Sequence, residues 1–176
     1  PFDAIIINAA GCGSTLVEYG ELLKDDPAWA ERAEAFSAKV KDLVSWLDGS
    51  RFPVSGSGAK VTYHDACYLG RHNDIYDAPR NVLGAVLSDE SGYIELEQSK
   101  SSSFCCGAGG GNMWHEDNRG ELVNNVRMQQ IIDSGAEQVV TACSFCMIML
   151  DDAAKGMGKA DDMAVQDIAE IIAERL

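Results

Sequence analysis

Two adjacent cysteines, Cys105 and Cys106, followed by the glycine-rich stretch 107–111, are the residues of this chain best suited to chemistry. On a regular strand their side chains would face opposite sides, and neighbouring Cα atoms, about 3.8 Å apart, are too close for ordinary disulfide geometry. The glycines remove side-chain bulk and permit positive φ, so the backbone can turn sharply and approach a bound group closely. Adjacent thiolates beside a bare backbone indicate a metal centre.

The remaining cysteines bear on which metal such a centre would hold. Cys67 stands alone, Cys143 and Cys146 form a CxxC pair, and Cys12 is an outlier. Because nothing in the sequence indicates secretion, we expect reduced thiols that are available to a metal. Zinc and ordinary cubane clusters need four ligands, whereas Cys67, the doublet and the CxxC pair supply five. This excess favours a larger or unusual iron–sulfur assembly, with a zinc clip and buried structural thiols as the alternatives.

Three predicted strands would bring these cysteines together. Apolar runs predict strands at 60–64, 93–96 and 138–142; Cys67 follows the first, the doublet follows the second after a serine-rich turn, and Cys143 follows the third. In an open α/β sheet, ligands bind beyond the carboxyl ends of the strands. We therefore expect five thiols at one edge of one sheet.

Helices are expected to alternate with these strands, which predicts an α/β fold with a mostly parallel sheet flanked by helices and right-handed crossovers. Short strands are also expected at 4–8 and 163–165. The expected helices cover residues 15–23, 27–47, 79–87, 116–134, 147–156 and 167–176.

The polar, glycine-rich stretch 49–59 is the best linker candidate, and it would separate a complete domain, residues 60–176, from an N-terminal segment, residues 1–48. Residues 139–146 line up with residues 5–12, with a helix expected after each. In this register Ala9 stands where Cys143 stands. We therefore expect segment 1–48 to be the tail of a degenerate first module and its connecting helix, cut from a longer protein that extends before Pro1.

The composition limits the partners. A formal net charge of −14 and a pI near 4.4 argue against binding to nucleic acid or to an anionic membrane surface. No apolar run approaches the roughly 20 residues of a membrane span, and no basic segment precedes an apolar one as in a signal peptide. We expect a cytoplasmic protein, or one held peripherally at the inner membrane by a complex.

Several residues near the cysteines are candidates to touch the metal ligands. His64 and Asp65 either tune a cluster through hydrogen bonds or merely cap the strand end. Arg71 either meets an anionic substrate or cluster sulfides, or is a solvated loop residue. Gly107 and Gly109 lie beside the doublet, but the glycine run is not a dinucleotide loop, because Asn112 replaces the third required glycine. No cofactor site beyond the metal is expected.

Three stretches together resemble the cysteine-rich CCG domain family: His64 to Arg71, Cys105 to Trp114, and Thr141 to Cys146. This family includes the catalytic subunit of heterodisulfide reductase, iron–sulfur subunits of glycolate and lactate oxidases, and proteins that pass electrons between flavoproteins and quinones. The stretch Asn8 to Gly13 is similar to the end of the first of two tandem modules in the glycolate-oxidase type. The resemblance covers nearly the whole chain.

The resemblance implies a non-cubane 4Fe–4S cluster, or a zinc ion as in some members, bound by Cys67, Cys105, Cys106, Cys143 and Cys146. It implies an oxidoreductase component that carries electrons between a flavoprotein partner and a disulfide, a quinone or another acceptor. The alternative is a zinc-bound structural or docking domain of a larger redox complex. Cys12 is expected to be a leftover of the first module, or else a ligand together with cysteines outside this chain.

Overall fold

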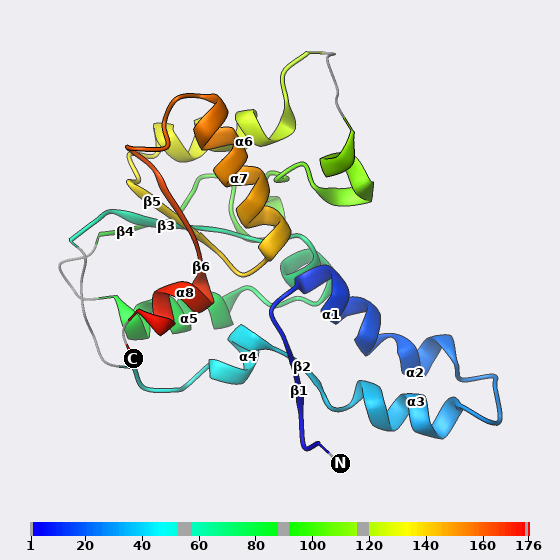
Figure 1. Ribbon diagram of the computed structural model, residues 1–176. Coiled ribbons are helices and arrows are strands. Elements are labelled where there is room, and N and C mark those ends of the chain that lie inside the picture. Colours follow the sequence, from blue (N-terminus) through cyan, green and yellow to red (C-terminus); the bar gives the residue numbers. More distant parts are fainter. Residues whose placement is uncertain (1, 53–57, 88–91, 116–119, 175) are drawn as a thin grey trace.

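The computed structural model describes residues 2–52, 58–87, 92–115, 120–174 and 176. It is an α/β structure in which every strand pairing is parallel (Figure 1). The larger sheet has the order β4-β3-β5-β6. Its strands are β3 (Val61–His64), β4 (Tyr93–Ile94), β5 (Gln138–Thr141) and β6 (Ala164–Asp167). The predicted parallel sheet flanked by helices is confirmed.

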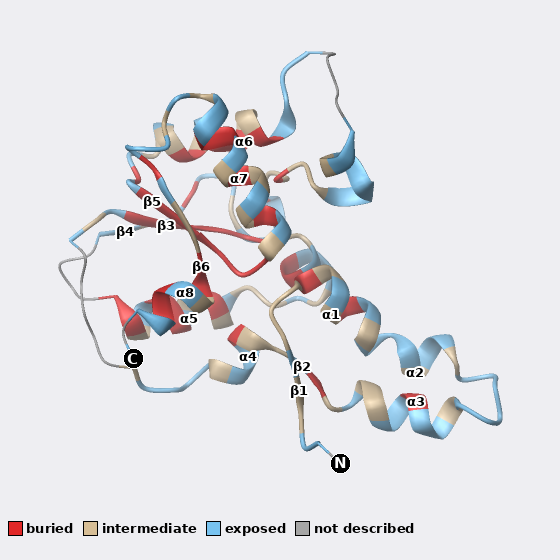
Figure 2. Cartoon of the chain, in the orientation of Figure 1, coloured by how far each residue is buried: buried red, intermediate tan, exposed pale blue. Residues whose placement is uncertain are grey.

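Helices cover both faces of the larger sheet. On one face lie α6 (Val123–Asp133) and α7 (Ser144–Gly156), and on the other lie α5 (Asp77–Val86) and α8 (Ile168–Ala173) (Figure 1). Every residue of β3 and β5 is buried, as expected of central strands covered on both sides (Figure 2). The two central strands are thereby held rigidly, together with whatever follows their carboxyl ends.

The N-terminal segment forms a second, smaller sheet. Its strand β1 (Ile5–Ile7) pairs with β2 (Val40–Asp42). Between the two strands the chain forms three helices, of which the last two make an arm that extends away from the larger sheet (Figure 1). These helices are α1 (Ala10–Val17), α2 (Tyr19–Leu22) and α3 (Ala30–Ser37).

The single helix predicted over residues 27–47 is therefore wrong. Helix α3 ends at Ser37, β2 follows, and a new helix, α4 (Leu43–Leu47), begins after Asp42, whose carboxylate accepts a hydrogen bond from the Val44 amide at 2.9 Å. The apolar spacing continues at helical intervals through this region, but pairing with β1 satisfies the backbone of Val40 to Asp42 instead.

Three short helical turns carry loop residues near the larger sheet: η1 (Tyr68–His72), η2 (Lys100–Ser102) and η3 (Gly109–Trp114). Helix α6 begins at Val123; of the residues predicted to precede it in the helix, 116–119 lie outside the described part of the chain and 120–122 are not helical. Residues 53–57 of the predicted linker also lie outside it. Among the helices that the structure describes, none combines the length and the apolar character needed to cross a bilayer.

Candidate metal centre

The larger sheet has its topological switch point between β3 and β5, because the connections from these two strands run to opposite sides of the sheet. The chain leaves β3 through α5 towards β4 on one side, and it leaves β5 through α7 towards β6 on the other. The last residues of the two strands, His64 and Thr141, are paired, and the Thr141 hydroxyl donates to the His64 carbonyl at 3.2 Å. Cys67 follows β3 and Cys143 follows β5. Both therefore stand at the switch point, where open α/β sheets bind ligands.

The cysteine doublet lies at the same edge of the sheet, but a longer loop, which contains η2, connects it to β4. Arg71 holds this loop, because its guanidinium donates to the carbonyl oxygens of Ser101, at 3.0 Å, and Ser103. Gly107 then turns the chain with a φ of 91°, and its amide donates to the Cys105 sulfur at 3.3 Å. A Cβ at position 107 would lie only 3.3 Å from the Val123 side chain, so glycine is needed there for both reasons.

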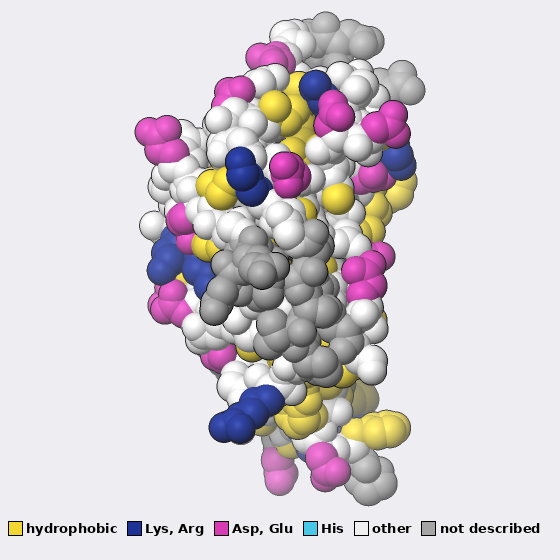
Figure 3. All heavy atoms as spheres, turned by 90° about the vertical axis from the view of Figure 1, so that its left-hand side faces the viewer, with side chains coloured by type: hydrophobic (Ala, Val, Ile, Leu, Met, Phe, Trp, Pro, Cys, Tyr) yellow, Lys and Arg dark blue, Asp and Glu magenta, His cyan; other side chains and the backbone are white. Residues whose placement is uncertain are grey.

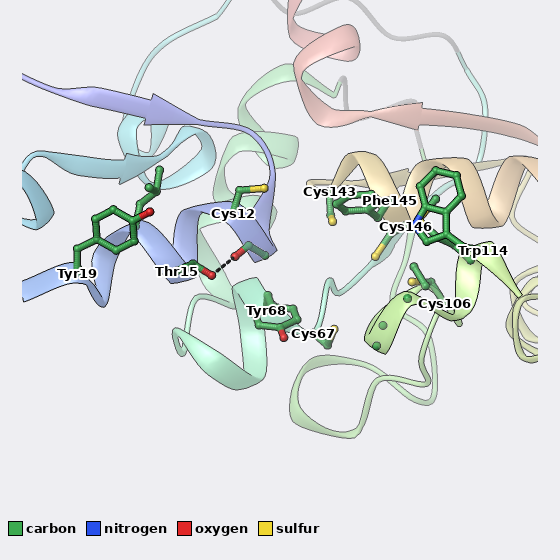
Figure 4. A pocket seen from close by; sticks show the side chains of 17 residues that line it. Cys12, Thr15, Tyr19, Cys67, Tyr68, Cys106, Trp114, Cys143, Phe145 and Cys146 are labelled. Atoms are coloured by element: carbon green, nitrogen blue, oxygen red, sulfur yellow. Dashed lines mark hydrogen bonds between the residues drawn. The ribbon is translucent and has the colours of Figure 1, made fainter. Parts of the chain in front are cut away.

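Four of the five predicted ligands line one pocket of about 560 Å³: Cys67, Cys106, Cys143 and Cys146 (Figure 4). The last three are almost completely buried, at 4%, 6% and 3% exposure, and Cys67 is half-buried. Cys105, also half-buried, does not line the pocket, but its thiol is hydrogen-bonded to Cys106. The pocket thus unites thiols from three distant parts of the sequence.

The other walls of the pocket are mostly apolar side chains or bare backbone. They include Gly109 and the side chains of Tyr68, Trp114 and Phe145, and Cys12 lies on α1 across from Cys143 (Figure 4). Apart from the cysteines, the pocket lining contains no Asp, Glu, Lys, Arg or His side chain in the part of the chain that the structure describes. Away from the cysteines this space therefore suits an apolar or sulfur-rich occupant better than water.

Hydrogen bonds among the thiols favour ionisation of two of them. The pKa of Cys106 lies far below its ordinary value, because the thiols of Cys105 and Cys146 and the ring of His64 hydrogen-bond to it. The pKa of Cys143 falls to about 6, chiefly through a hydrogen bond from Cys146. The Cys146 pKa is raised in return. Thiolates are the ligands of iron–sulfur clusters and of structural zinc, so the donor set fits either group.

A histidine completes the buried group. A ring nitrogen of His64 and the sulfurs of Cys106 and Cys146 all lie within 4.8 Å of one another. The side chain of His64 is fully buried, and burial lowers its pKa, so the ring is neutral. Its Nδ1 accepts a hydrogen bond of 3.1 Å from Nε of Arg127.

Arg127 was not among the residues expected near the centre. A signal was present in the sequence, because Arg127 falls on the buried face of α6 with Asn124, Met128 and Ile131, where an apolar residue is the norm. A charged residue at such a position needs a partner in the interior, and the sequence does not identify that partner.

The carboxylate of Asp65 is hydrogen-bonded to groups other than the cysteines. Both of its oxygens accept hydrogen bonds from Arg80, at 2.8 and 2.9 Å, and one also accepts the Lys100 amide at 2.7 Å. Arg80 in turn binds Glu95. This ion-pair network fixes the strand end beside His64 and the loop that leads to the doublet.

Residues 61–151 match the family model of the CCG cysteine-rich domain. The chain is 40% identical to the EtfAB:quinone oxidoreductase of Syntrophomonas wolfei over 71% of its length. It is 34% identical to one component of the dihydromethanophenazine:CoB–CoM heterodisulfide reductase of Methanosarcina barkeri, and 32% identical to a probable glycolate oxidase iron–sulfur subunit of Bacillus subtilis, each over 98% of its length. The chain spans only 18%, 40% and 38% of these three relatives, respectively.

Proposed function

Since this chain belongs to the CCG cysteine-rich domain family, we propose that it is the iron–sulfur module of an oxidoreductase. The observation that carries the proposal is the convergence of Cys67, Cys106, Cys143 and Cys146 on one pocket at the switch point of the sheet. Relatives named as an iron–sulfur subunit and as redox enzymes support it. The module would pass electrons between a redox partner and an acceptor.

The proposed ligands are Cys67, Cys105, Cys106, Cys143 and Cys146, and the proposed group is a 4Fe–4S cluster of the non-cubane type. When bound, such a cluster supplies one-electron transfer. The chain would supply the environment for it. Strands β3 and β5 fix the positions of Cys67 and Cys143, the hydrogen bonds around Cys106 keep its sulfur ionised, and the apolar walls keep water away.

We further propose a flavoprotein as the electron donor and a disulfide, a quinone or another redox centre as the acceptor. Apart from the cysteines, the described pocket walls carry no charged side chain, which suits an acceptor whose reacting part is uncharged. Acidic side chains are spread over the face of the molecule seen in Figure 3, in keeping with the net charge of −14, and nucleic acid is not among the proposed partners. A cytoplasmic location is also part of this proposal.

A second candidate is a zinc-bound structural or docking domain. The observation in its favour is the buried group of His64, Cys106 and Cys146, whose donor atoms lie within 4.8 Å of one another. Histidine and cysteine together are common zinc ligands. The two candidates differ in metal content and in redox activity.

The experiment is the anaerobic determination of iron and acid-labile sulfide, with visible absorption and electron paramagnetic resonance spectra before and after dithionite. We expect stoichiometric iron and sulfide and a broad absorption that dithionite bleaches. Cys106→Ser should lose most of the iron, and Cys12→Ser, the control on the far wall of the same pocket, should keep it. A colourless protein with about one zinc would support the second candidate instead.

A further inference from the structure

We propose that Arg127 and His64 act together as positioning residues for the metal centre. Arg127 fixes the His64 ring so that Nε2 carries the proton and donates to the Cys106 sulfur, and His64 is therefore not a metal ligand. This inference rests on the proposed function, because it concerns Cys106 as a ligand. Arg127 is also a source of positive charge beside the cluster of cysteines.

Arg127 is a buried cation whose identified hydrogen-bond partners are all neutral. Its side chain is 0% exposed. Besides His64, it donates to the carbonyl oxygen of Gln98 at 3.1 Å, to Oε1 of Gln130 at 2.8 Å and to Oγ of Ser103 at 3.3 Å. Burial lowers its pKa to about 10, so the guanidinium remains charged at neutral pH.

The charge of Arg127 needs a counter-charge nearby, because an uncompensated buried cation is costly. The carboxylate that acts on it, Asp65, already binds Arg80 with both oxygens. Cys146, which lies beside His64, is the other group that acts on Arg127, and it lies next to the ionised Cys106. The anionic cysteine cluster is thus the group that the guanidinium is placed to balance.

The hydrogen bond between Arg127 and His64 decides the tautomer of the ring. Arginine can only donate, so Nδ1 of His64 offers its lone pair and has no proton. A neutral imidazole then carries its proton on Nε2, and this is the ring N–H that we assign as donor to the Cys106 sulfur, which lies within 4.8 Å of the ring. A protonated Nε2 has no lone pair for a metal. His64 is thereby removed from the set of zinc or iron ligands.

The expected consequence is a higher reduction potential for a cluster bound at Cys106. A hydrogen bond to a ligating sulfur and a buried positive charge both stabilise the additional electron. Arg80 offers a contrast, since its charge is neutralised by Asp65 and Glu95 and it donates to neither cysteine nor histidine in the described structure.

The first test compares reduction potentials in the anaerobically purified, cluster-loaded chain. Arg127→Met should retain iron but shift the reduction equilibrium about tenfold towards the oxidised form, which is about 59 mV for a one-electron couple. Arg127→Lys, which keeps the charge but loses the planar donor, should shift it less. Arg32→Met, on the exposed arm, is the control and should not shift it. An unchanged potential in a folded, iron-loaded Arg127→Met would overturn the inference and leave the proposed function intact.

The second test reads the tautomer directly, from ¹⁵N-histidine nuclear magnetic resonance spectra of the anaerobically purified chain. Only three histidines contribute signals, so His64→Gln assigns its own. We expect a proton on Nε2 and none on Nδ1, with that preference lost in Arg127→Met. A proton on Nδ1, or a metal on Nε2, would refute the inference. Absence of iron from the wild-type chain would instead refute the proposed function, and the tautomer can still be measured in that case.

Discussion

The chain contains two units of the same design, residues 5–47 and residues 138–173. In each, a strand is followed by a residue in extended conformation, Ala9 or Cys143, that begins a helix. Each then returns to a strand parallel to the first, which ends at an aspartate, Asp42 or Asp167. That aspartate caps a short final helix by accepting a backbone amide at 2.9 Å.

The register of the two units also agrees. The last residue of the first strand pairs with the capping aspartate in both, Ile7 with Asp42 and Thr141 with Asp167. Cys12 and Cys146 are each the third residue of the helix that follows. The units differ in the connection between their strands, which is three helices in the first and α7 alone in the second. They also differ in chemistry: the second presents a buried CxxC pair, and the first presents alanine and one exposed cysteine. The interpretation of the first unit as a degenerate module stays a prediction.

A strand, a cap and a helix are therefore not sufficient for a metal centre. The second unit is functional, in our proposal, because β3 and the glycine-turned loop deliver Cys67 and Cys106 to the same pocket. The first unit contributes the opposite wall of that pocket through α1 (Figure 4). Three predictions test how far the two units differ.

The largest effect is expected from Cys143→Ala, which gives the second unit the capping residue of the first. This change removes a buried thiol whose sulfur accepts a hydrogen bond from Cys146. We expect loss of most of the iron and of the visible absorption, with the helical circular dichroism unchanged. Iron content and spectra are measured on anaerobic preparations, and Ala9→Ser, the matched change in the first unit, should have no effect on either. Full iron retention in Cys143→Ala would remove this residue from the ligand set.

The sequence was a good guide to the centre of the fold. Buried apolar runs predicted β3 and β5 to within a residue, and cysteines placed just after them could be expected at one sheet edge because parallel strands share that edge. The helix after Cys143 was also predictable, since its apolar spacing has no competing partner nearby.

Other features depended on tertiary contacts that no local pattern contains. Val40 to Asp42 have helical spacing, and only the presence of β1 beside them makes them a strand. Asp65 looked like a candidate at the metal, but Arg80, fifteen positions away, takes both of its oxygens. The role of Arg127 depends on His64, which lies 63 positions before it, and no local pattern links the two residues.

A second, smaller difference is expected in packing. Leu150 and Leu16 occupy matching places on α7 and α1, but Leu150 is fully buried against the larger sheet, whereas Leu16 is half-buried at the pocket wall. Leu150→Ala should lower the free energy of unfolding by about 2–5 kcal/mol. Leu16→Ala should lower it by about 1 kcal/mol. Urea denaturation measures both, and equal losses would show that the first unit is packed as tightly as the second.

The capping aspartates supply the third prediction, on pH. Burial, reinforced by the charge of Asp167, raises the pKa of Asp42 from 3.8 to about 6. Between these two values the folded state binds more protons than the unfolded state, so stability falls as pH rises from about 4 to about 6. A shift of about two units corresponds to a loss of about 3 kcal/mol at neutral pH as an upper limit, because other groups relax around the charge.

Asp42→Asn keeps a capping side chain but cannot ionise, so it should flatten the fall in stability between about pH 4 and pH 6. Urea denaturation at several pH values measures the slope. The matched variant is Asp167→Asn, because the pKa of Asp167 is also raised by burial, although the hydrogen bond from Asn8 opposes that rise. Its effect should have the same sign and should be smaller. If Asp42→Asn kept the wild-type slope while Asp167→Asn removed it, the capping charge that limits stability would belong to the unit with the CxxC pair, contrary to the large rise in the pKa of Asp42.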